Sequence, residues 1–450
     1  MPPILALFLG FVVVAWLLRR DVAFRGRMSL TLWVPFLWLL IRGSRPVTAW
    51  IGYGGASEVE GNPVEALVAF CLFFAAFVVL LRRRFPWSRL PALNVALTLL
   101  FVYFAVSCLW SPNTFVAFKR WSKEMGAIFV ILVILTEARP MEALKGLCVR
   151  CAYVLFPLSE VLIKYYPEFG REYSVEGGLM VNGVTDQKNT LGLICCVFGL
   201  ALIWDIVDAR KLSGGAGSRR RLLPQWIALA LGMWLLVQCE SKTSLLAFLA
   251  GLAIFLGTSV PMIRRVPTFF ARCWVVIVPV VLIVAAVNTV VFAPVLETLG
   301  RNTTFTERTK IWTLVLDQKT DPLVGTGFYS FWLANGPDVW SKLGGVPITS
   351  SHNGYLETYL DGGFIGCALL GLFLLGTGWR LARAYSPDHS STRVMLAYAI
   401  MALITNFAEV YFFRLDTLWF CLEFSAFALA LVPLTALAPE TPVIPEEATV

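Results

Sequence analysis

The side chains best suited to chemistry lie in residues 349–357. His352 is one of only two histidines in the 450 residues, and Asn353 and Gly354 follow it directly. An imidazole exchanges protons near neutral pH, so His352 is a candidate general base or a hydrogen-bond donor to an anion. The alternative is a helix cap, in which Ser351 or Asn353 accepts hydrogen bonds from the first free amides of a following helix.

The composition predicts an all-α polytopic membrane protein. Hydrophobic residues make up 58% of the chain, mean hydropathy is +0.73, and charged residues account for only 15%. Soluble domains carry about 25% charged residues. Apolar stretches such as 91–110, 189–207, 269–292 and 364–379 recur along the chain. A spanning helix needs ~20 residues and lipid offers the backbone no partners, so we expect about 12–13 transmembrane helices.

The order of these stretches predicts four segments. Residues 1–292 form the N-terminal transmembrane helices, and 293–361 form one large periplasmic loop that carries the candidate site. Residues 362–436 form the C-terminal transmembrane helices, and 437–450 form a disordered cytoplasmic tail that is acidic and contains proline. The first apolar segment, 4–18, ends in Arg19 and Arg20. A cleaved signal peptide has its positive charge before the apolar run, so we expect a retained helix.

Basic residues in the short loops predict the orientation. Five clusters fall on one side of the predicted helices, and excess Lys and Arg mark the cytoplasmic side. The clusters are Arg19, Arg20, Arg25 and Arg27; Arg82, Arg83, Arg84 and Arg89; Arg210, Lys211, Arg219, Arg220 and Arg221; Arg264 and Arg265; and Arg380, Arg383 and Arg393. The long loop then faces the periplasm, which predicts a multi-pass protein of the bacterial inner membrane with a periplasmic active site.

The net charge of +8 is explained mostly by these clusters and gives no reason to expect a nucleic-acid partner. The ten cysteines are scattered through apolar segments, where cysteine commonly behaves as a small hydrophobe. Cys148 and Cys151 have metal-type spacing but no matching second pair. We therefore expect neither a metal nor a cofactor.

Several basic residues lie on the predicted outer side, against the charge rule. They are Lys119, Arg120, Lys123, Lys188, Lys242, Arg301, Arg308 and Lys310. Any one of them is readily explained by solvation or by pairing with an acid such as Glu124 or Glu307. As a set, outer cations at the lipid boundary suit the diphosphate of a lipid carrier, because guanidinium groups bind phosphate oxygens in a bidentate way.

The large loop also shows helical and turn signals. Thr306 predicts a helix start, and Ile311, Leu314 and Val315 follow at helical spacing. Gly325 and Gly327 predict a turn. Four aromatic residues, Phe328, Phe331, Trp332 and Trp340, are interpreted either as platforms for sugar rings or as an interfacial aromatic belt.

Four passages resemble the O-antigen ligase/polymerase superfamily, most closely its exopolysaccharide-production branch. Residues 109–112 read Leu-Trp-Ser-Pro, with Arg120 following, and 187–192 read Gln-Lys-Asn-Thr-Leu-Gly. Residues 240–246 read Glu-Ser-Lys-Thr-Ser-Leu-Leu. The fourth passage runs from 301 to 312 and continues with Gly-Thr-Gly at 325–327 and His-Asn-Gly-Tyr-Leu at 352–356. Order and spacing agree over about residues 90 to 430. Glu307 departs from the pattern, because many relatives have glycine before the arginine.

The resemblance implies a metal-independent glycosyltransferase. Its donor would be a glycan on a polyprenyl pyrophosphate, and its acceptor a hydroxyl of another glycan or of lipid A-core. Membrane lipid and other proteins of polysaccharide assembly are candidate partners. We assign His352, Arg308 and Arg301 to catalysis. The substrate-binding candidates are Lys188, Asn189, Lys242, Arg120, Asn353, Trp312 and Tyr355.

Alternatives remain at this point. A polymerase would extend a lipid-linked repeat unit, a ligase would transfer glycan to lipid A-core, and the likeness to the exopolysaccharide branch favours the polymerase. A transporter or flippase would bind the same substrate without forming bonds, but we find no convincing internal repeat. A structural membrane subunit would have no need of the His-Asn loop. Among acids in apolar segments, Glu409 and Glu423 have no obvious partner.

Overall fold

The apolar stretches form helices in a computed structural model of the chain. The structure describes residues 1–52, 61–173, 177–213, 222–257, 303–345, 347–386 and 388–431, with a few single positions between 273 and 280. In chain order the elements are α1 (Pro3–Arg25), α2 (Trp33–Arg42), α3 (Val47–Trp50), α4 (Pro63–Arg82), α5 (Leu90–Leu93), α6 (Val95–Ser107), α7 (Thr114–Leu135), α8 (Pro140–Tyr165), α9 (Pro167–Gly170), β1 (Arg171–Tyr173), β2 (Leu179–Val181), α10 (Lys188–Ser213), α12 (Leu223–Gln238), α13 (Lys242–Leu256), α16 (Thr303–Leu316), α17 (Phe331–Lys342), α18 (Gly354–Ala384), α19 (Ser390–Thr405) and α20 (Thr417–Leu431). Three short 3-10 helices precede α2, α5 and α7 (Leu30–Leu32, Trp87–Arg89 and Cys108–Trp110), and β1 and β2 pair antiparallel.

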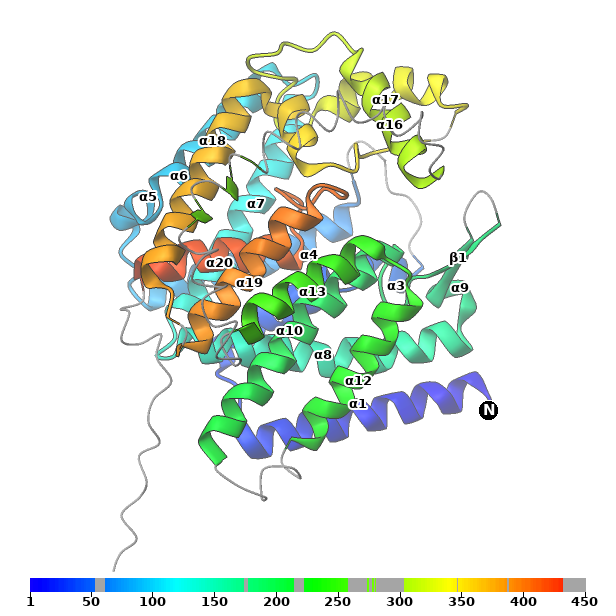
Figure 1. Cartoon of the computed structure of the whole chain (residues 1–450), viewed down its shortest axis with the longest axis vertical. Coiled ribbons are helices and arrows are strands. Elements are labelled where there is room, and N and C mark those ends of the chain that lie inside the picture. Colours follow the sequence, from blue (N-terminus) through cyan, green and yellow to red (C-terminus); the bar gives the residue numbers. More distant parts are fainter. Residues whose placement is uncertain are drawn as a thin grey trace, which may run out of the picture.

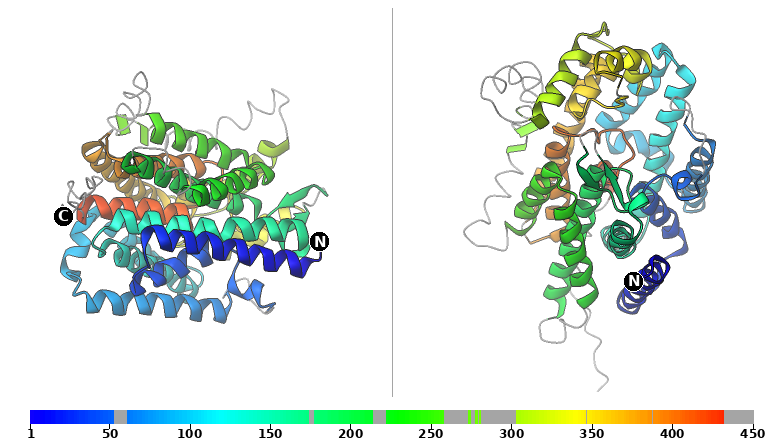
Figure 2. Two further views of the ribbon diagram at one scale, coloured as in Figure 1. Left: turned by 90° about the horizontal axis from the view of Figure 1, so that it is seen from below. Right: turned by 90° about the vertical axis from the view of Figure 1, so that its right-hand side faces the viewer.

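The described helices confirm the all-α polytopic membrane fold. Five of them (α1, α4, α8, α10 and α18) are long and apolar enough to cross a membrane, and five shorter apolar helices accompany them. Figure 2 (left) shows many of these helices running roughly parallel. The predicted total of about 12–13 crossings remains a prediction, since most of 258–302 lies outside the described residues.

The apolar stretch 91–110 does not form one straight helix. A bend of 101° separates Trp87–Leu93 from Val95–Trp110. Asn94 explains the break, because its side chain accepts a hydrogen bond from the amide of Leu97 and so caps the start of α6. An N-cap residue leaves the helical conformation, and the chain changes direction there.

Burial divides the helices into an inner and an outer set. The most apolar 18-residue windows of α8 and α10 are 78% and 83% buried, whereas those of α1 and α4 are 22% and 11% buried. Exposed side chains on α1 and α4 include Phe8, Phe11, Phe70 and Phe74. We infer that α1 and α4 face lipid and that α8 and α10 form the centre of the bundle.

The loop helices α16 and α17 pack on the start of α18 around a small core of their own. Ile311, Trp312, Phe331 and Val339 are buried there against Leu360. In Figure 1, α16 and α17 lie at the top and α1 lies at the bottom. The predicted helix of 306–315 is confirmed, and it begins three residues earlier, at Thr303.

Two glycine contacts tie this loop to α18. Gly325 has a φ of 65°, and a Cβ there would lie 2.6 Å from the backbone of Asp361. Gly363 has a φ of 58° and kinks α18, and a Cβ there would lie 2.4 Å from the backbone of Leu323. Only glycine combines this backbone conformation with so close an approach. The predicted turn at Gly325 and Gly327 is confirmed, since Gly327 also has a positive φ, 95°.

Candidate functional site

The carboxylate of Glu409 joins three of the predicted site residues. Its Oε1 atom accepts hydrogen bonds from Asn189 Nδ2 at 2.6 Å and from Arg308 Nη2 at 3.0 Å. Its Oε2 atom lies 3.3 Å from His352 Nδ1. Asn189 comes from the start of α10, Arg308 from α16, and His352 from the loop before α18. Residues predicted separately from sequence therefore converge on one acid.

The contact between His352 and Glu409 determines which ring nitrogen is available for proton transfer. A carboxylate only accepts hydrogen bonds, so the proton of a neutral imidazole sits on Nδ1. Nε2 then keeps its lone pair, and no described residue forms a hydrogen bond with it. The side chain of His352 is 36% exposed, so a reactant has access to it. The arrangement is that of a general base oriented by an acid.

Backbone hydrogen bonds join the end of the His352 loop to the loop that follows α19 and carries Glu409. The amide of Gly354 donates to the carbonyls of Asn406 at 2.8 Å and Glu409 at 3.0 Å. The side chain of Asn406 in turn accepts hydrogen bonds from the amides of Tyr411 and Phe412. A Cβ on Gly354 would lie only 2.0 Å from Asn406 Oδ1. Glycine is therefore required at 354 for the loop that carries Glu409 to approach the His352 loop.

The helix-cap interpretation is correct for Asn353. Its Oδ1 atom accepts hydrogen bonds from the amides of Tyr355 at 3.0 Å and Leu356 at 3.1 Å. Ser351 donates through its hydroxyl to the carbonyl of Asn353. His352 lies between them with a φ of 51°, a region that costs energy for residues other than glycine. The cap thus fixes the backbone that presents the imidazole, and the two interpretations are compatible.

Trp312 and Tyr355 are buried supports of the same loop. Trp312 is 1% exposed, and its indole donates to the carbonyl of Ser351 at 2.8 Å. Tyr355 is 6% exposed, and its hydroxyl donates to the carbonyl of Leu403 at 2.9 Å. Both side chains hold the positions of their neighbours, and neither is open to a substrate in this structure.

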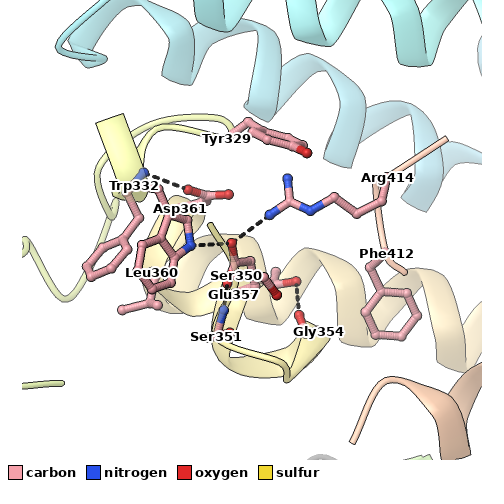
Figure 3. Close-up of polar contacts among 12 residues, drawn as sticks. Tyr329, Trp332, Ser350, Ser351, Gly354, Glu357, Leu360, Asp361, Phe412 and Arg414 are labelled. Atoms are coloured by element: carbon pink, nitrogen blue, oxygen red, sulfur yellow. Dashed lines mark hydrogen bonds and ion pairs between the residues drawn. The ribbon is translucent and has the colours of Figure 1, made fainter. Parts of the chain in front are cut away.

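A second polar cluster centres on Glu357, which accepts a hydrogen bond from the amide of Ser351, the residue before His352. Glu357 accepts hydrogen bonds from Arg414 Nη2 at 2.6 Å, from the indole of Trp332 at 2.8 Å and from the amide of Ser351 at 3.0 Å. In Figure 3 the guanidinium of Arg414 extends towards Glu357 below the ring of Tyr329. Sequence reasoning missed Glu357 and Arg414, although charge in a largely apolar segment is itself a signal of function.

Arg120 belongs to this second cluster and not to the Glu409 group. Its Nη1 atom donates to the carbonyl of Tyr329 at 2.7 Å, and its guanidinium lies 4.6 Å from the centre of that ring. The guanidinium of Arg414 lies 3.4 Å from the same ring. Burial acts to lower the pKa of Arg414, but Tyr329, Glu357 and Asp361 outweigh it and raise the pKa. Arg414 therefore stays charged, and a small cavity opens beside it.

Two of the four aromatic residues of the large loop are buried, and the other two are held through their indole nitrogens. Phe328 is 2% exposed and Phe331 is fully buried. Trp332 is bonded to Glu357, and the indole of Trp340 donates to the carbonyl of Ile348 at 2.6 Å. Phe328 and Phe331 are therefore not available as sugar platforms or as an interfacial belt in this structure, whereas Trp332 and Trp340 are partly exposed and both interpretations stay predictions for them.

The two predicted lysines lie at helix starts that pack together. Lys188 begins α10, next to Asn189, and Lys242 begins α13. A Cβ on Gly192 of α10 would lie 2.5 Å from Ser244 Oγ of α13, so the two helices are in close contact there. Lys242 is exposed. Arg301 lies outside the described residues, and the described part of the chain has no group of ligands able to hold a metal ion.

The Glu409 cluster and the basic clusters lie at opposite ends of the same helices. α10 begins beside Glu409, and Lys211 in its last turn donates to the carbonyl of Asp388 at 3.5 Å. α18 begins beside His352, and Arg380 near its other end donates to the carbonyl of Leu93. On these two helices the basic residues lie at the end away from Glu409 and His352, and the predicted orientation of the chain in the membrane stays a prediction.

The family comparison identifies the part of the chain that contains this loop. Residues 227–371 match the family model described as O-Antigen ligase. The match confirms the resemblance to the O-antigen ligase/polymerase superfamily, in a multi-pass membrane protein. It includes Arg308 and His352, whereas Asn189 and Glu409 lie outside it. None of the curated proteins matches the chain.

Proposed function

We propose that this O-antigen ligase family protein transfers a glycan from a polyprenyl-pyrophosphate donor to an acceptor hydroxyl on the periplasmic face. The observation that carries the proposal is the convergence of Arg308, His352 and Asn189 on the carboxylate of Glu409. It puts a cation for a leaving diphosphate and a base for a hydroxyl within one small site.

The chemistry needs only these groups. The bond between the sugar anomeric carbon and the diphosphate oxygen breaks, and a bond from the acceptor oxygen to that carbon forms. The proton of the acceptor hydroxyl passes to His352 Nε2, and the electron pair of the broken bond leaves on the diphosphate. Arg308, with Asn189, Lys188 and Arg301 as further candidates, stabilises that charge.

Of the two activities in the superfamily, ligase and polymerase, we propose that this chain is a polymerase. It would extend lipid-linked repeat units, as in exopolysaccharide or O-antigen assembly. The likeness of residues 109–112, 187–192 and 240–246 to the exopolysaccharide branch supports this choice. The ligase, with lipid A-core as acceptor, is the alternative, and the description of the matching family supports it.

The test uses purified protein in lipid nanodiscs with a lipid-diphosphate oligosaccharide isolated from cells that lack this chain. Longer lipid-linked glycans support the polymerase, and glycan on added lipid A-core supports the ligase. Movement of the oligosaccharide across the bilayer without new bonds would make the protein a transporter.

Substitutions at His352 test the base. Removing a general base costs about 10²–10⁴-fold in turnover. We expect that loss in His352→Ala and also in His352→Gln, because an amide forms hydrogen bonds but takes no proton. Activity restored by His352→Gln would show that His352 only positions a substrate.

A further inference from the structure

The ion pair of Glu357 and Arg414 connects the two loops that bring His352 and Glu409 together. Arg414 Nη2 donates to Glu357 Oε1 at 2.6 Å (Figure 3). Oε2 of the same carboxylate accepts the amide of Ser351 at 3.0 Å, so Glu357 fixes the residue before His352. Arg414 lies five residues after Glu409 in the loop that follows α19. One side-chain contact therefore acts on both loops.

Arg414 is itself held by contacts with two other parts of the chain. Its guanidinium lies 3.4 Å from the centre of the Tyr329 ring. Its backbone carbonyl accepts a hydrogen bond from Arg42 Nη2 at 3.4 Å, and the carbonyl of Leu415 accepts one from Arg42 Nε at 2.7 Å. An arginine fork also fixes the direction of its carboxylate partner, which a lysine ammonium does not. Arg414 therefore gives Glu357 a partner of fixed position.

Strained backbone is concentrated around this pair. Among the described residues, six that are not glycine have a positive φ, and four of the six lie here with φ between 51° and 56°: Tyr329, His352, Phe413 and Leu415. Two of these four flank Arg414 in the sequence. Such conformations cost energy and persist only where surrounding contacts enforce them, which is common at functional sites.

Stability alone does not account for the pair. The side chains of Arg414 and Glu357 are only 13% and 4% exposed. Desolvating two charges offsets most of their attraction, so a buried ion pair contributes little net stability compared with apolar residues of similar volume. What the pair supplies is a defined distance between two segments that are 57 residues apart in the sequence.

The contact that depends on this distance is a long one. His352 Nδ1 lies 3.3 Å from Glu409 Oε2, beyond the usual range of about 2.7–3.2 Å for such hydrogen bonds, so a small shift of either loop would break it. The amide of Gly354 also joins the two loops. The ion pair of Glu357 with Arg414 is a second point of attachment, and it keeps the loop from rotating about the first.

We propose that Glu357 and Arg414 are positioning residues that hold the carboxylate of Glu409 against His352 Nδ1. The inference rests on the proposed glycan transfer and deepens it, because the orientation of the base would depend on the pair. Their effect passes through the contact of His352 with Glu409. It should therefore change kcat and the position of the imidazole proton, and leave the KM for the donor nearly unchanged.

The position of that proton is open to direct observation, because the chain has only two histidines. The parent protein is the full chain with His389→Gln and isotope-labelled histidine, in lipid nanodiscs. Nitrogen NMR is recorded without substrate at alkaline pH, where an imidazole is neutral, and couplings to the ring protons distinguish the two ring nitrogens. We expect the parent to carry the proton on Nδ1 of His352 alone.

A double variant and a matched control test the pair. Glu357→Gln/Arg414→Gln removes both charges together and should show both tautomers of the imidazole. In the transfer assay its kcat should fall by up to about 10²-fold, as expected for a misplaced catalytic group. The control, Arg83→Gln/Glu137→Gln, removes a partly buried ion pair just past the C-terminal end of α7 and should keep the proton on Nδ1.

The outcomes separate the alternatives, with folding checked by thermal melting. A folded Glu357→Gln/Arg414→Gln protein with the proton still on Nδ1 would overturn the proposal, and so would a parent with the proton on Nε2 or a control that loses the Nδ1 form. If the double variant does not fold, Arg414→Lys keeps the charge without the fork. Both tautomers in that variant would support the proposal, and Nδ1 alone would overturn it. The expected NMR pattern in a chain that transfers no glycan would contradict only the proposed function.

Discussion

Replacing Glu409 with glutamine tests the whole arrangement of the donor site. Asn189 and Arg308 both donate to Oε1, at 2.6 and 3.0 Å, so the glutamine must keep its oxygen on that side. Its amide NH₂ then faces His352 Nδ1, where the carboxylate oxygen now lies at 3.3 Å. An amide donor requires Nδ1 to accept, which moves the imidazole proton to Nε2. The base would be lost although every side chain keeps its shape.

The expected magnitude follows from that tautomer change. A general base contributes about 10²–10⁴-fold, so kcat should fall within that range. Arg308 would keep one neutral hydrogen bond in place of a charged one and would remain free to bind phosphate, so the KM for the donor should change much less. The assay is steady-state glycan transfer with purified protein, with expression and thermal stability measured alongside.

A matched control and a clear refutation are available. Glu168→Gln removes one exposed carboxylate near the same end of the bundle and should leave kcat unchanged. Glu409→Asp keeps the acceptor and should retain more activity than Glu409→Gln. A well-folded Glu409→Gln protein with kcat within twofold of wild type would refute the orienting role of Glu409 and the base role of His352 together.

The remaining predictions concern the leaving group, the loop contact and the orientation. Arg308→Ala should lower transfer at least tenfold, since a charge-assisted contact contributes on the order of 1.5–3 kcal/mol, and Arg308→Lys should restore only part, as kinetic analysis would show. Gly354→Ala should lower the melting temperature and transfer, because a Cβ would lie 2.0 Å from Asn406 Oδ1; a wild-type melting curve would contradict this. Single cysteines at Thr349 and Ser218, in a background without reactive native thiols, should be labelled in intact cells by an impermeant reagent at 349 only. Labelling at 218 alone would reverse the orientation.

The sequence was sufficient to predict the class of the fold, and it singled out three residues that the structure brings to Glu409. Composition and apolar length are local properties of the chain, and they indicate membrane helices directly. Arg308, Asn189 and His352 were found because their residue types suit phosphate binding and proton transfer. The bend before α6 was missed, since a single Asn94 inside an apolar run does not reveal that its side chain will cap a helix.

The acids of the site could not be predicted, for a physical reason. Glu409 follows His352 by 57 residues, with α18 and α19 in between, and Arg414 follows Glu357 of α18 also by 57 residues. Such pairs form only when helices that are far apart in the sequence pack together, so local periodicity in the sequence does not predict them. Asn353, in contrast, caps the amides of Tyr355 and Leu356, two and three residues further along the chain, so its capping role was visible in the sequence.

The shared carboxylate also couples the two halves of the proposed reaction. Arg308 and Asn189 donate hydrogen bonds to Oε1 of Glu409, and His352 Nδ1 contacts Oε2 of the same carboxylate. A diphosphate that engages Arg308 takes over part of the positive charge that Glu409 now balances. More negative charge is then left for the imidazolium that forms when His352 accepts the hydroxyl proton. One carboxylate therefore links the cation that would hold the leaving diphosphate to the imidazole that would take the hydroxyl proton.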